Sequence, residues 1–557
     1  MMQAADLRAR LLGAIETHRA GRLEEAIDGY REVLARHPAQ FDALRLLGAA
    51  LSGVGRHEEG LAMLERALQL KTGLPEVWAL RGDALSRLGR REEAVSSYER
   101  ALMSQPNVSS TWISLGAQLR ALGRPAEALA RFERAVALDP RSATLWIHHG
   151  EALNELGRHS EAVASYDCAL SLGAPRPAEV WHLRGVALRS LGSRESALDC
   201  CDRALKLESD QPPARVLRAV LLAELGRIDD AFPALGEAVE RTPEDAAAQF
   251  NLGMLNLTAG RFEEGWERYE WRKKVAQFSM PEAPDGPTWT GTEPLAGRRL
   301  LLIAEQGLGD TIHFCRFAPL LAQQGAQIKL VVQPSLTTLL SSLAGSVDVT
   351  STVEPMPAFD LQCSLLSVPK ALGTTLATIP APVPYLSPPS GRLRAWRELL
   401  GVARKPRIGL VCSGSAQHGN DRNRSIGLQQ FALLRSLDVE WHLLQADLRE
   451  SDQASLAVLG IVDHRSRLTD FAETAALASC MDAVVSVDTA VAHLAGALGL
   501  GLLLLLPEVP DWRWMLERGD SPWYPSARIF RRPSRGDWSE PLQQVGEALR
   551  SLQSGTK

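Results

Sequence analysis

The first half of the chain repeats one arrangement of small, large and polar positions. A glycine, usually followed by arginine, recurs at a spacing of 34 residues with a single spacing of 35, at Gly21, Gly55, Gly89, Gly123, Gly157, Gly192, Gly226 and Gly260. A small residue lies five positions after each glycine, and a large apolar residue usually lies four positions further, as in Ala94 and Tyr98. Small residues packed against large ones are typical of helix pairs, so the pattern predicts a series of helical hairpins.

Tryptophans and prolines mark the same unit. A tryptophan lies eleven residues before four of the glycines, at Trp78, Trp112, Trp146 and Trp181, and a further glycine follows each of them by four residues, where two helices must approach closely. This pattern resembles the tetratricopeptide repeat over residues 5–272, and implies a superhelix of about eight repeats. The resemblance implies a concave surface that binds an extended peptide or a partner protein. We interpret the tryptophans as core side chains.

The helical period stops near residue 276. Residues 273–297 are rich in proline, glycine and threonine and are predicted to be a linker. Short apolar runs then alternate with helical stretches: "RRLLLIA", "QIKLVVQ", "FDLQCS", "RIGLVCSG", "EWHLLQA", "DAVVSVDT" and "GLLLLLP". This alternation predicts parallel sheets that bind ligands at the carboxyl ends of their strands. A proline-rich stretch at 380–389 separates two predicted Rossmann-like lobes, a short one at 298–385 and a second at 405–545, joined by an interlobe segment at 386–404.

The stretch "AEQGLGDTIHF" at 304–314 begins where the first predicted strand of this region ends. Gly307 and Gly309 would let the backbone approach a ligand, and Asp310 would lie at the start of the next helix. Asp310 has two interpretations: an N-cap of that helix, or a carboxylate that works in a cleft between the lobes.

Two further stretches follow predicted strands of the second lobe. The first is a polar loop with Asn420, Arg422, Asn423, Arg424 and Ser425, which could bind a diphosphate or could be a solvated arginine loop. The second holds Asp488, Thr489 and His493, with the histidine four residues beyond the threonine on a helix. These three residues could converge on one ligand, or could be a helix cap and a core histidine.

The segment at 511–532 is dense in tryptophan and arginine. It could stack a base or a sugar at the edge of the cleft, or could pack between the lobes. From this segment we select Trp512 and Arg513 as candidate donor-binding residues.

The composition of the chain argues against several classes of function. The 557 residues carry 61 basic and 66 acidic side chains, a net charge of −5, and no basic stretch that would follow a nucleic-acid backbone. Seven scattered cysteines indicate neither disulfides nor a metal site. We find no secretory signal and no apolar run long enough to span a bilayer, so we expect a cytoplasmic protein without a membrane span.

The three strand-end motifs, above all "DTAVAHLAGALG", resemble glycosyltransferase family 9, the heptosyltransferases, over residues 298–535. The resemblance implies the two-lobed GT-B fold and metal-independent, inverting transfer of a sugar from a nucleotide-sugar, with no cofactor. It implies that Asp310 is the general base and that Asp488, Thr489 and His493 bind the donor. The polar loop lies where family members contact the donor phosphates, although the family usually has a lysine there.

The first lobe is shorter than the usual acceptor-binding lobe of that family. Repeats fused ahead of a transferase resemble the layout of tetratricopeptide-containing protein O-glycosyltransferases, whose own catalytic motifs this chain lacks. That likeness implies a protein acceptor held by the repeats and modified on Ser or Thr. Bacterial enzymes of this layout suggest flagellin or another surface protein as the acceptor.

Two alternatives remain open. The chain could be a heptosyltransferase-like enzyme that modifies lipopolysaccharide or a small glycan, with repeats that only dock partner proteins. It could also be a non-catalytic repeat scaffold. A phosphate loop of the GxxxxGK[ST] type and a GxSxG nucleophile elbow are both missing from the sequence, which argues against ATPase and hydrolase functions.

Overall fold

The computed structural model describes residues 2–275, 278, 284–352, 358–415, 420–533 and 536–553. The chain divides into two compact units, Met1–Ala214 and Arg215–Lys557. Each unit is described separately below.

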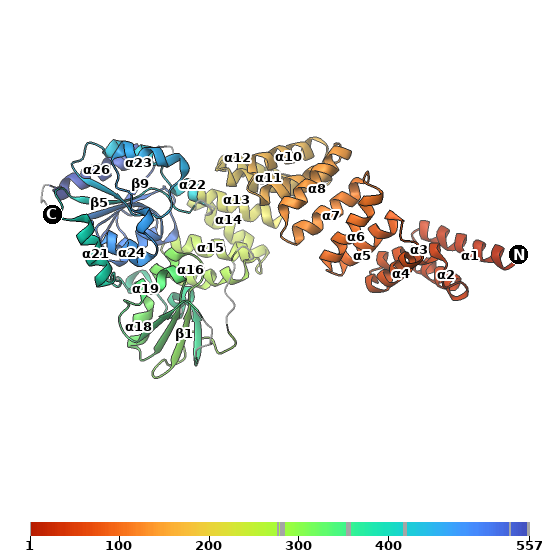
Figure 1. Cartoon of the computed structure of the whole chain (residues 1–557), viewed down its shortest axis with the longest axis horizontal. Helices are drawn as coiled ribbons and strands as arrows, with labels where there is room; N and C mark the ends of the chain where they lie inside the picture. Colours follow the sequence, from red (N-terminus) through yellow and green to blue (C-terminus); the bar gives the residue numbers. More distant parts are fainter. Residues whose placement is uncertain are drawn as a thin grey trace. The chain divides into compact units, whose positions relative to one another are not determined.

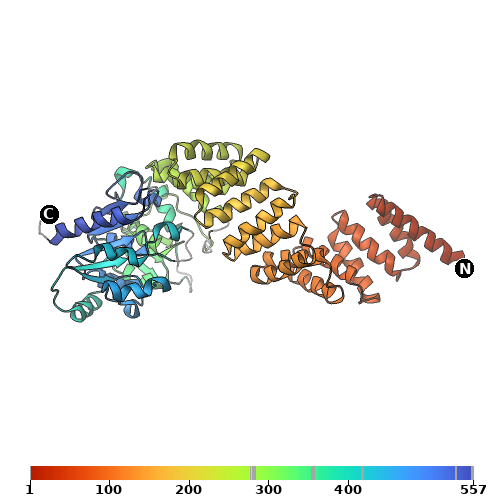
Figure 2. The ribbon, with the colours of Figure 1, turned by 90° about the horizontal axis from the view of Figure 1, so that it is seen from above.

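The first unit is a stack of helical hairpins (Figure 2). Each hairpin pairs an odd-numbered with the following even-numbered helix, and successive hairpins pack side by side. The helices are α1 (Met2–Arg19), α2 (Leu23–Arg36), α3 (Phe41–Gly53), α4 (His57–Leu70), α5 (Pro75–Arg87), α6 (Arg91–Ser104), α7 (Ser109–Ala121), α8 (Pro125–Leu138), α9 (Ala143–Glu155), α10 (His159–Ser171), α11 (Pro177–Ser190) and α12 (Arg194–Leu207).

Glycine is required at the recurring positions for two different structural reasons. Those in the turns have a positive φ, as in Gly89 at 74°, which side chains other than glycine rarely adopt. Those within the helices make room for an aromatic ring: a Cβ on Gly82 would lie 2.6 Å from the ring of Tyr98. The predicted contact between a small and a large residue is therefore confirmed at the atomic level.

The second unit begins with the last two hairpins of the repeat region. They comprise α13 (Pro212–Glu224), α14 (Ile228–Arg241), α15 (Ala246–Thr258) and α16 (Phe262–Tyr269), followed by the short helix η1 (Glu270–Lys274). The boundary between the units thus lies inside the repeat region and not in the linker at 273–297. The physical reason is that the last hairpin shares an apolar core with the sheets that follow, through Phe262, Trp266 and Tyr269.

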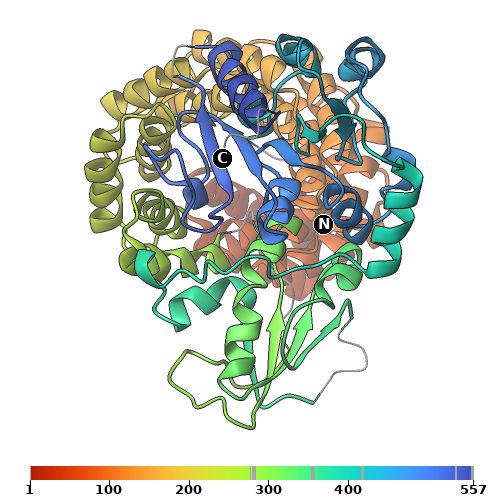
Figure 3. The ribbon, with the colours of Figure 1, turned by 90° about the vertical axis from the view of Figure 1, so that its left-hand side faces the viewer.

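The first sheet has four parallel strands in the order β3-β2-β1-β4 (green in Figure 3). The central strand β1 pairs with β2 on one side and with β4 on the other. Its elements are β1 (Arg299–Ile303), α17 (Leu308–Phe314), α18 (Phe317–Gln323), β2 (Gln327–Val331), η2 (Pro334–Leu336), α19 (Thr337–Leu340), β3 (Val347–Thr350), β4 (Leu361–Ser364), η3 (Leu365–Ser367), α20 (Val368–Ala371) and η4 (Leu376–Thr378).

The second sheet has five parallel strands in the order β6-β5-β7-β8-β9 (blue in Figure 3). It follows α21 (Ser390–Leu400), and its elements are β5 (Arg407–Val411), α22 (Asp421–Arg424), η5 (Leu428–Leu434), β6 (Glu440–Leu443), η6 (Glu450–Asp452), α23 (Gln453–Leu459), η7 (Arg465–Arg467), α24 (Phe471–Ala478), β7 (Ala483–Val487), α25 (Ala490–Ala497), β8 (Leu502–Leu506), η8 (Trp512–Trp514), β9 (Ala527–Arg531) and α26 (Ser539–Gln553). Figure 1 labels the larger elements along the chain.

All seven predicted strands form, and two further strands, β3 and β9, were not predicted. β9 lies inside the tryptophan- and arginine-rich segment, and its sequence ARIFR holds two arginines and so forms no continuous apolar run. The single helix expected after Asp310 is instead two short helices, α17 and α18, and Asp310 lies in the first turn of α17. A helical solenoid followed by parallel sheets is therefore the observed architecture.

Candidate active site between the two sheets

Asp310 is held at the N-terminus of α17, facing the second sheet. One carboxylate oxygen, Oδ2, accepts a hydrogen bond of 2.9 Å from the backbone N–H of Gly307, the N-cap residue. The other oxygen, Oδ1, forms an ion pair with Arg513, which follows β8 of the second sheet. Asp310 is therefore not the N-cap residue but lies three positions further, where one oxygen accepts from the N-cap backbone and the other pairs with an arginine of the opposite sheet. That this carboxylate works in a cleft stays a prediction.

The turn before Asp310 is braced by its own sheet. Gln306 has φ = 63°, a left-handed conformation that is uncommon outside glycine. Its carbonyl oxygen accepts a hydrogen bond of 3.1 Å from Gln333, and the Thr311 hydroxyl donates to the oxygen of the same Gln333 side chain at 2.9 Å. The strand end at β2 therefore fixes the loop that carries Gly307.

Gly309 serves a helix contact. A Cβ at this position would lie 3.1 Å from Cδ2 of His493 and 3.4 Å from Cα of Ala490, both on α25. The sequence-based expectation that Gly309 admits a ligand therefore needs correction: its missing side chain lets α17 of the first sheet touch α25 of the second. Gly307, by contrast, is exposed and caps α17.

This contact gives a direct prediction. We expect Gly309→Ala to lower stability by about 1–3 kcal/mol, the usual cost of overpacking a tight contact. Thermal unfolding measures it, with Gly391→Ala as the control because nothing lies within 4 Å of a Cβ there. Equal melting temperatures for both variants would show that the helices do not touch this closely.

Arg513 is the most connected charge of the site. Its guanidinium pairs with Asp310 and, at 2.8 Å, with Asp511, and lies over the rings of Trp512 at 4.4 Å and Phe314 at 5.4 Å. Only 6% of the Arg513 side chain is exposed, against 22% for Asp310. The arginine is thus buried while its partner carboxylate reaches solvent.

Trp512 is a packing residue. It is 1% exposed and its ring lies among those of Trp266, Phe314 and Trp523. Of the two alternatives for this segment, packing holds for Trp512, so the expectation that its ring edges a cleft needs correction. The sequence could not show that Trp512 packs while Trp514 contacts the site, because both residues follow the same strand and differ only in the direction of their side chains.

Asp488 lies close to the Arg513 cluster. Its Oδ1 accepts a hydrogen bond of 2.9 Å from the indole N–H of Trp514 and lies 4.0 Å from Nε2 of His493. Burial raises the pKa of Asp488 to about 6; the neighbouring Asp511 carboxylate adds to the rise, and Arg424 opposes it. Asp488 is therefore a carboxyl group that titrates near neutral pH.

The raised pKa predicts how Asp488 affects stability. An acid whose folded-state pKa exceeds its unfolded value of 3.8 favours folding at pH 4 and loses that contribution as the pH rises through about 6. We expect Asp488→Asn, which keeps an oxygen for Trp514, to match the wild type at pH 4 and to be more stable at pH 8, by at most about 3 kcal/mol. Melting temperatures measured between pH 4 and pH 8 test this prediction, and Asp447→Asn, at an exposed position, is the control. A stability change in Asp488→Asn that is the same at every pH would contradict it.

Thr489 and His493 belong to the start of α25, next to Asp488. Thr489 is the N-cap residue of α25, but its side chain makes no capping hydrogen bond. His493 stacks on Trp514 at 5.2 Å, and its Nδ1 lies 3.0 Å from the hydroxyl of Tyr524. Burial, followed by the charge of Arg513, lowers the pKa of His493 well below its ordinary value, so it is neutral at pH 7.

A second histidine meets the same tyrosine. Nδ1 of His313, on α17, also lies 3.0 Å from the Tyr524 hydroxyl, which therefore links the two sheets. Next to it, Arg316 donates to the Trp523 carbonyl at 2.8 Å and to the Tyr385 hydroxyl at 2.9 Å. The sequence analysis did not select these residues. They could have been noticed because they are polar side chains within otherwise apolar stretches.

The predicted phosphate loop is only partly described, because residues 416–419 lie outside the described residues. Arg424 acts on the pKa of Asp488 and its guanidinium occupies the space beside Gly414. Ser425 donates to Asp421 at 2.7 Å, and Asn423 accepts from Arg532 at 2.9 Å.

Asn420 and Arg422 are exposed. The structure therefore brings Arg424 to the site and gives Ser425 and Asn423 structural contacts.

The arrangement can bind an anion and move a proton. Arg424 and Arg513 are the cations around Asp488, and within the described ranges the Nε of each is buried without a hydrogen-bond partner. Among the residues that the structure describes, no group of three His, Cys, Asp or Glu side chains could hold a metal ion. Metal independence itself stays a prediction.

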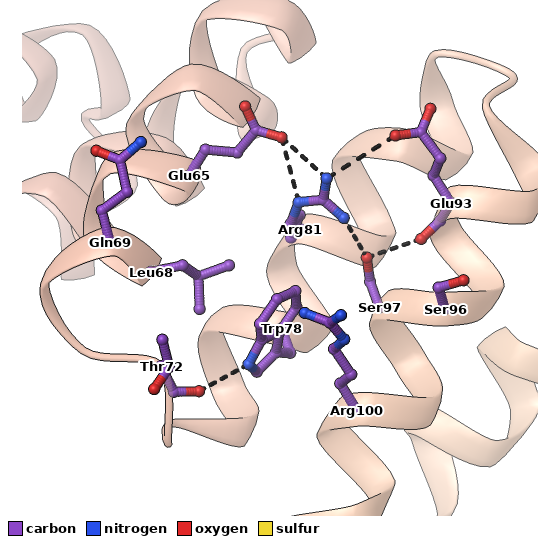
Figure 4. Close-up of a pocket in the computed structure, with 10 residues that line it drawn as sticks. All are labelled: Glu65, Leu68, Gln69, Thr72, Trp78, Arg81, Glu93, Ser96, Ser97 and Arg100. Atoms are coloured by element: carbon purple, nitrogen blue, oxygen red, sulfur yellow. Dashed lines mark hydrogen bonds and ion pairs between the residues drawn. The ribbon is translucent and has the colours of Figure 1, made fainter.

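The repeats have pockets of their own. One of about 570 Å³ lies between α4, α5 and α6 in the first unit (Figure 4). Arg81 donates to Glu65 at 2.9 Å and to the Ser97 hydroxyl at 2.7 Å, and Arg100 lies 4.6 Å over the ring of Trp78. Trp78 is thus only partly buried, with charged groups beside it.

Comparison with known proteins agrees with both halves of this description. The Tetratricopeptide repeat models match residues 18–75, 75–108, 113–177, 178–211 and 216–265, and the model of Glycosyltransferase family 9 (heptosyltransferase) matches residues 467–530. The chain thus matches tetratricopeptide repeats through most of residues 18–265 and resembles family 9 glycosyltransferases over residues 467–530. The family 9 match includes Asp488, Thr489, His493, Trp512 and Arg513, and does not reach Asp310.

One curated protein is similar to a large part of the chain. Protein FlbA of Caulobacter vibrioides (strain ATCC 19089 / CIP 103742 / CB 15) is 28% identical over 368 residues, which is 60% of this chain. The match spans 61% of that relative, less than two thirds of its length. It therefore supports the repeat–transferase combination and leaves activity and partners to be proposed.

Solved structures resemble parts of the chain only distantly. YrrB, described as a TPR protein with an unusual peptide-binding site, is 23% identical with a TM-score of 0.31, covering 33% of this chain and 95% of its own. PilF of Pseudomonas aeruginosa is 18% identical with a TM-score of 0.35, covering 39% and 99%. TM-scores below 0.5 carry no conclusion about function here. Separately, in the described part of the chain no helix is both long enough and apolar enough to cross a membrane.

Proposed function

We propose that this chain is an inverting, metal-independent glycosyltransferase of the GT-B type that moves a sugar from a nucleotide-sugar to a Ser or Thr of a protein acceptor. The observation that carries the proposal is the ion pair of Asp310 from the first sheet with Arg513 from the second, whose charge also acts on Asp488. The family 9 match over residues 467–530, which include Asp488 and Arg513, supports glycosyl transfer as the reaction class.

The residues have separate tasks in this reaction. The Asp310 carboxylate takes the proton of the acceptor hydroxyl as that oxygen bonds to the anomeric carbon. The bond from that carbon to the diphosphate breaks, and the nucleoside diphosphate leaves with the electron pair. Arg424 and Arg513 stabilise the departing diphosphate without a metal. Asp488, Thr489 and His493 bind the donor beside them.

The ion pair with Arg513 suits a base that must be ionised at neutral pH. A neighbouring cation favours the charged form of a carboxylate, and only this form can take a proton from a hydroxyl. The hydrogen bond from the Gly307 N–H holds Oδ2 of Asp310 in place, and this fixes the direction in which Oδ1 points.

The repeats would recruit the acceptor. Tetratricopeptide repeats are protein-interaction modules, and the pocket between α4, α5 and α6 offers both charged groups and an aromatic ring to a peptide. Flagellin or another surface protein is the acceptor that the layout suggests. The alternative substrate is a lipopolysaccharide or small glycan acceptor.

The test is an incubation of the full chain with candidate acceptor proteins and a panel of nucleotide-sugars, read by intact mass. One sugar mass added to the protein supports the proposal, and fragmentation then locates the modified Ser or Thr. Sugar found on a glycolipid and not on protein supports the alternative. No transfer with any donor, together with no thermal shift by any nucleoside diphosphate, would favour a scaffold.

A further inference from the structure

The last repeat hairpin packs directly on the segment that carries Arg513. The rings of Trp266 and Trp512 lie 5.2 Å apart at 88°, an edge-to-face contact, and Tyr269 lies 6.3 Å from the same Trp512. A Cβ on Gly260, in the turn before α16, would lie 2.8 Å from the methyl group of Met515. The segment 512–515 is therefore pressed against a tetratricopeptide hairpin.

The same hairpin also holds the segment that leads to Asp310. Arg272 of η1 is fully buried and pairs with Glu305, which lies directly after β1 and five residues before Asp310. Arg272 also donates to the Ser367 hydroxyl at 2.9 Å, and the indole N–H of Trp266 donates to the carbonyl of Thr374 at 2.9 Å. The hairpin is thus attached to the first sheet by buried polar contacts.

Trp266 touches both rings that lie beneath the Arg513 guanidinium. Those rings are Trp512, on the segment of Arg513, and Phe314, on the helix of Asp310, whose ring lies 6.3 Å from Trp266. A change at Trp266 would therefore disturb both of the rings on which the Arg513 guanidinium lies.

Tyr269 brings a hydroxyl into the charged cluster. The charges of Arg513, Arg272, Asp310 and Asp511 all act on it, and burial raises the pKa of Tyr269, so that it stays a neutral O–H group. The ring of Tyr269, supplied by a repeat and not by either sheet, lies against Trp512 and has the Arg272 guanidinium 4.8 Å over it.

We propose that the last tetratricopeptide hairpin is part of the reaction site, with Trp266 and Tyr269 acting as positioning residues that hold Arg513 against Asp310. This rests on the proposed function, because it assigns a task within that reaction. It implies that the repeats do more than recruit an acceptor: the final one completes the site.

The chain offers a matched pair of variants. Tyr269 and Tyr166 occupy the same position of their repeats, and each loses only a hydroxyl when changed to phenylalanine. We expect Tyr269→Phe to lower kcat about tenfold with the KM for the nucleotide-sugar within about twofold, since one oriented polar group is lost from the site. Tyr166→Phe, in the first unit, should leave both unchanged.

The pH profile separates positioning from simple destabilisation. If Arg513 moves away from Asp310, the carboxylate loses its neighbouring cation, so the acid limb of the kcat profile of Tyr269→Phe should move to higher pH. Trp266→Phe should keep more activity than Trp266→Leu, because a ring at that position restores the contact with Trp512. An unmoved acid limb in Tyr269→Phe, or an equal effect of Tyr166→Phe, would overturn the proposal.

A crystal structure of Tyr269→Phe provides a readout that does not need activity. The proposal expects the guanidinium of Arg513 to leave the Asp310 carboxylate, and an unchanged ion pair would refute it. If the wild type transfers no sugar at all, the proposed function fails, while this structural comparison still decides the positioning role.

Discussion

A fragment of residues 210–557 should fold cooperatively, whereas a fragment of residues 298–557 should aggregate. The first keeps the second compact unit with α13–α16, and the second begins after the linker, where the sequence alone would start the transferase. The shorter fragment loses Phe262, Trp266 and Tyr269, which are each at most 3% exposed in the shared core. It would expose the apolar surface that they cover.

The shorter fragment also leaves a buried charge without its partner. Removing Arg272 strands the Glu305 carboxylate, which is 3% exposed, and breaking such a buried pair costs about 3–5 kcal/mol. That is a large part of the roughly 5–15 kcal/mol by which domains are stable. Circular dichroism, size-exclusion chromatography and thermal unfolding of the two fragments measure the difference.

The contribution of the ion pair can be isolated in the full chain. Arg272→Met alone should lower the melting temperature strongly, and Arg272→Met with Glu305→Gln should restore part of the loss, because the second change removes the stranded charge. If the fragment 298–557 unfolds at the same temperature as 210–557, the repeat hairpin is not part of the transferase fold.

Asp310→Asn should lower the rate of sugar transfer by about 10²–10⁴-fold, the range that general bases contribute. The change keeps the size of the side chain and an oxygen that can accept from Gly307 or face Arg513, and removes the ability to take a proton. Donor binding should survive, because the candidate donor-binding groups Asp488 and Arg424 are untouched. Single-turnover kinetics and a thermal-shift titration with nucleoside diphosphates measure the two effects separately.

The matched control is Asp348→Asn on the same sheet. Asp348 also pairs with a cation, Lys329 at 2.6 Å, but its side chain is 71% exposed and lies on the edge strand β3. It should transfer sugar at the wild-type rate. If Asp310→Asn transfers as fast as this control, Asp310 is not the base, and the assignment of the reaction to this cluster must be abandoned.

Much of the fold could be predicted because its signals are local. A glycine at a positive φ in a turn, or a glycine beneath the ring of Tyr98, is visible as a period of 34 residues without knowledge of anything distant. Buried parallel strands such as β7 and β8 are continuous apolar runs. Strand β9 and the break between α17 and α18 were missed, because mixed composition and a few residues at an element end decide them.

The candidate site could be predicted only in part. The sequence placed Asp310, Asp488, Thr489 and His493 after strands or at helix starts, because the carboxyl ends of parallel strands meet at one edge. It could not separate Trp512, which only packs, from Trp514, which is equally buried but donates to Asp488. Neighbouring residues of one segment point in directions that only packing fixes.

The sequence by itself determined that the chain is a repeat solenoid followed by parallel sheets, and that polar groups gather at strand ends. Only the tertiary structure decided that Asp310 pairs with Arg513, 203 residues away, that Gly309 admits a helix, and that the last repeat shares an apolar core with the two sheets. The physical reason is that backbone preference and apolar periodicity act between near neighbours in the chain. Which side chains meet across two sheets depends on how complete elements pack.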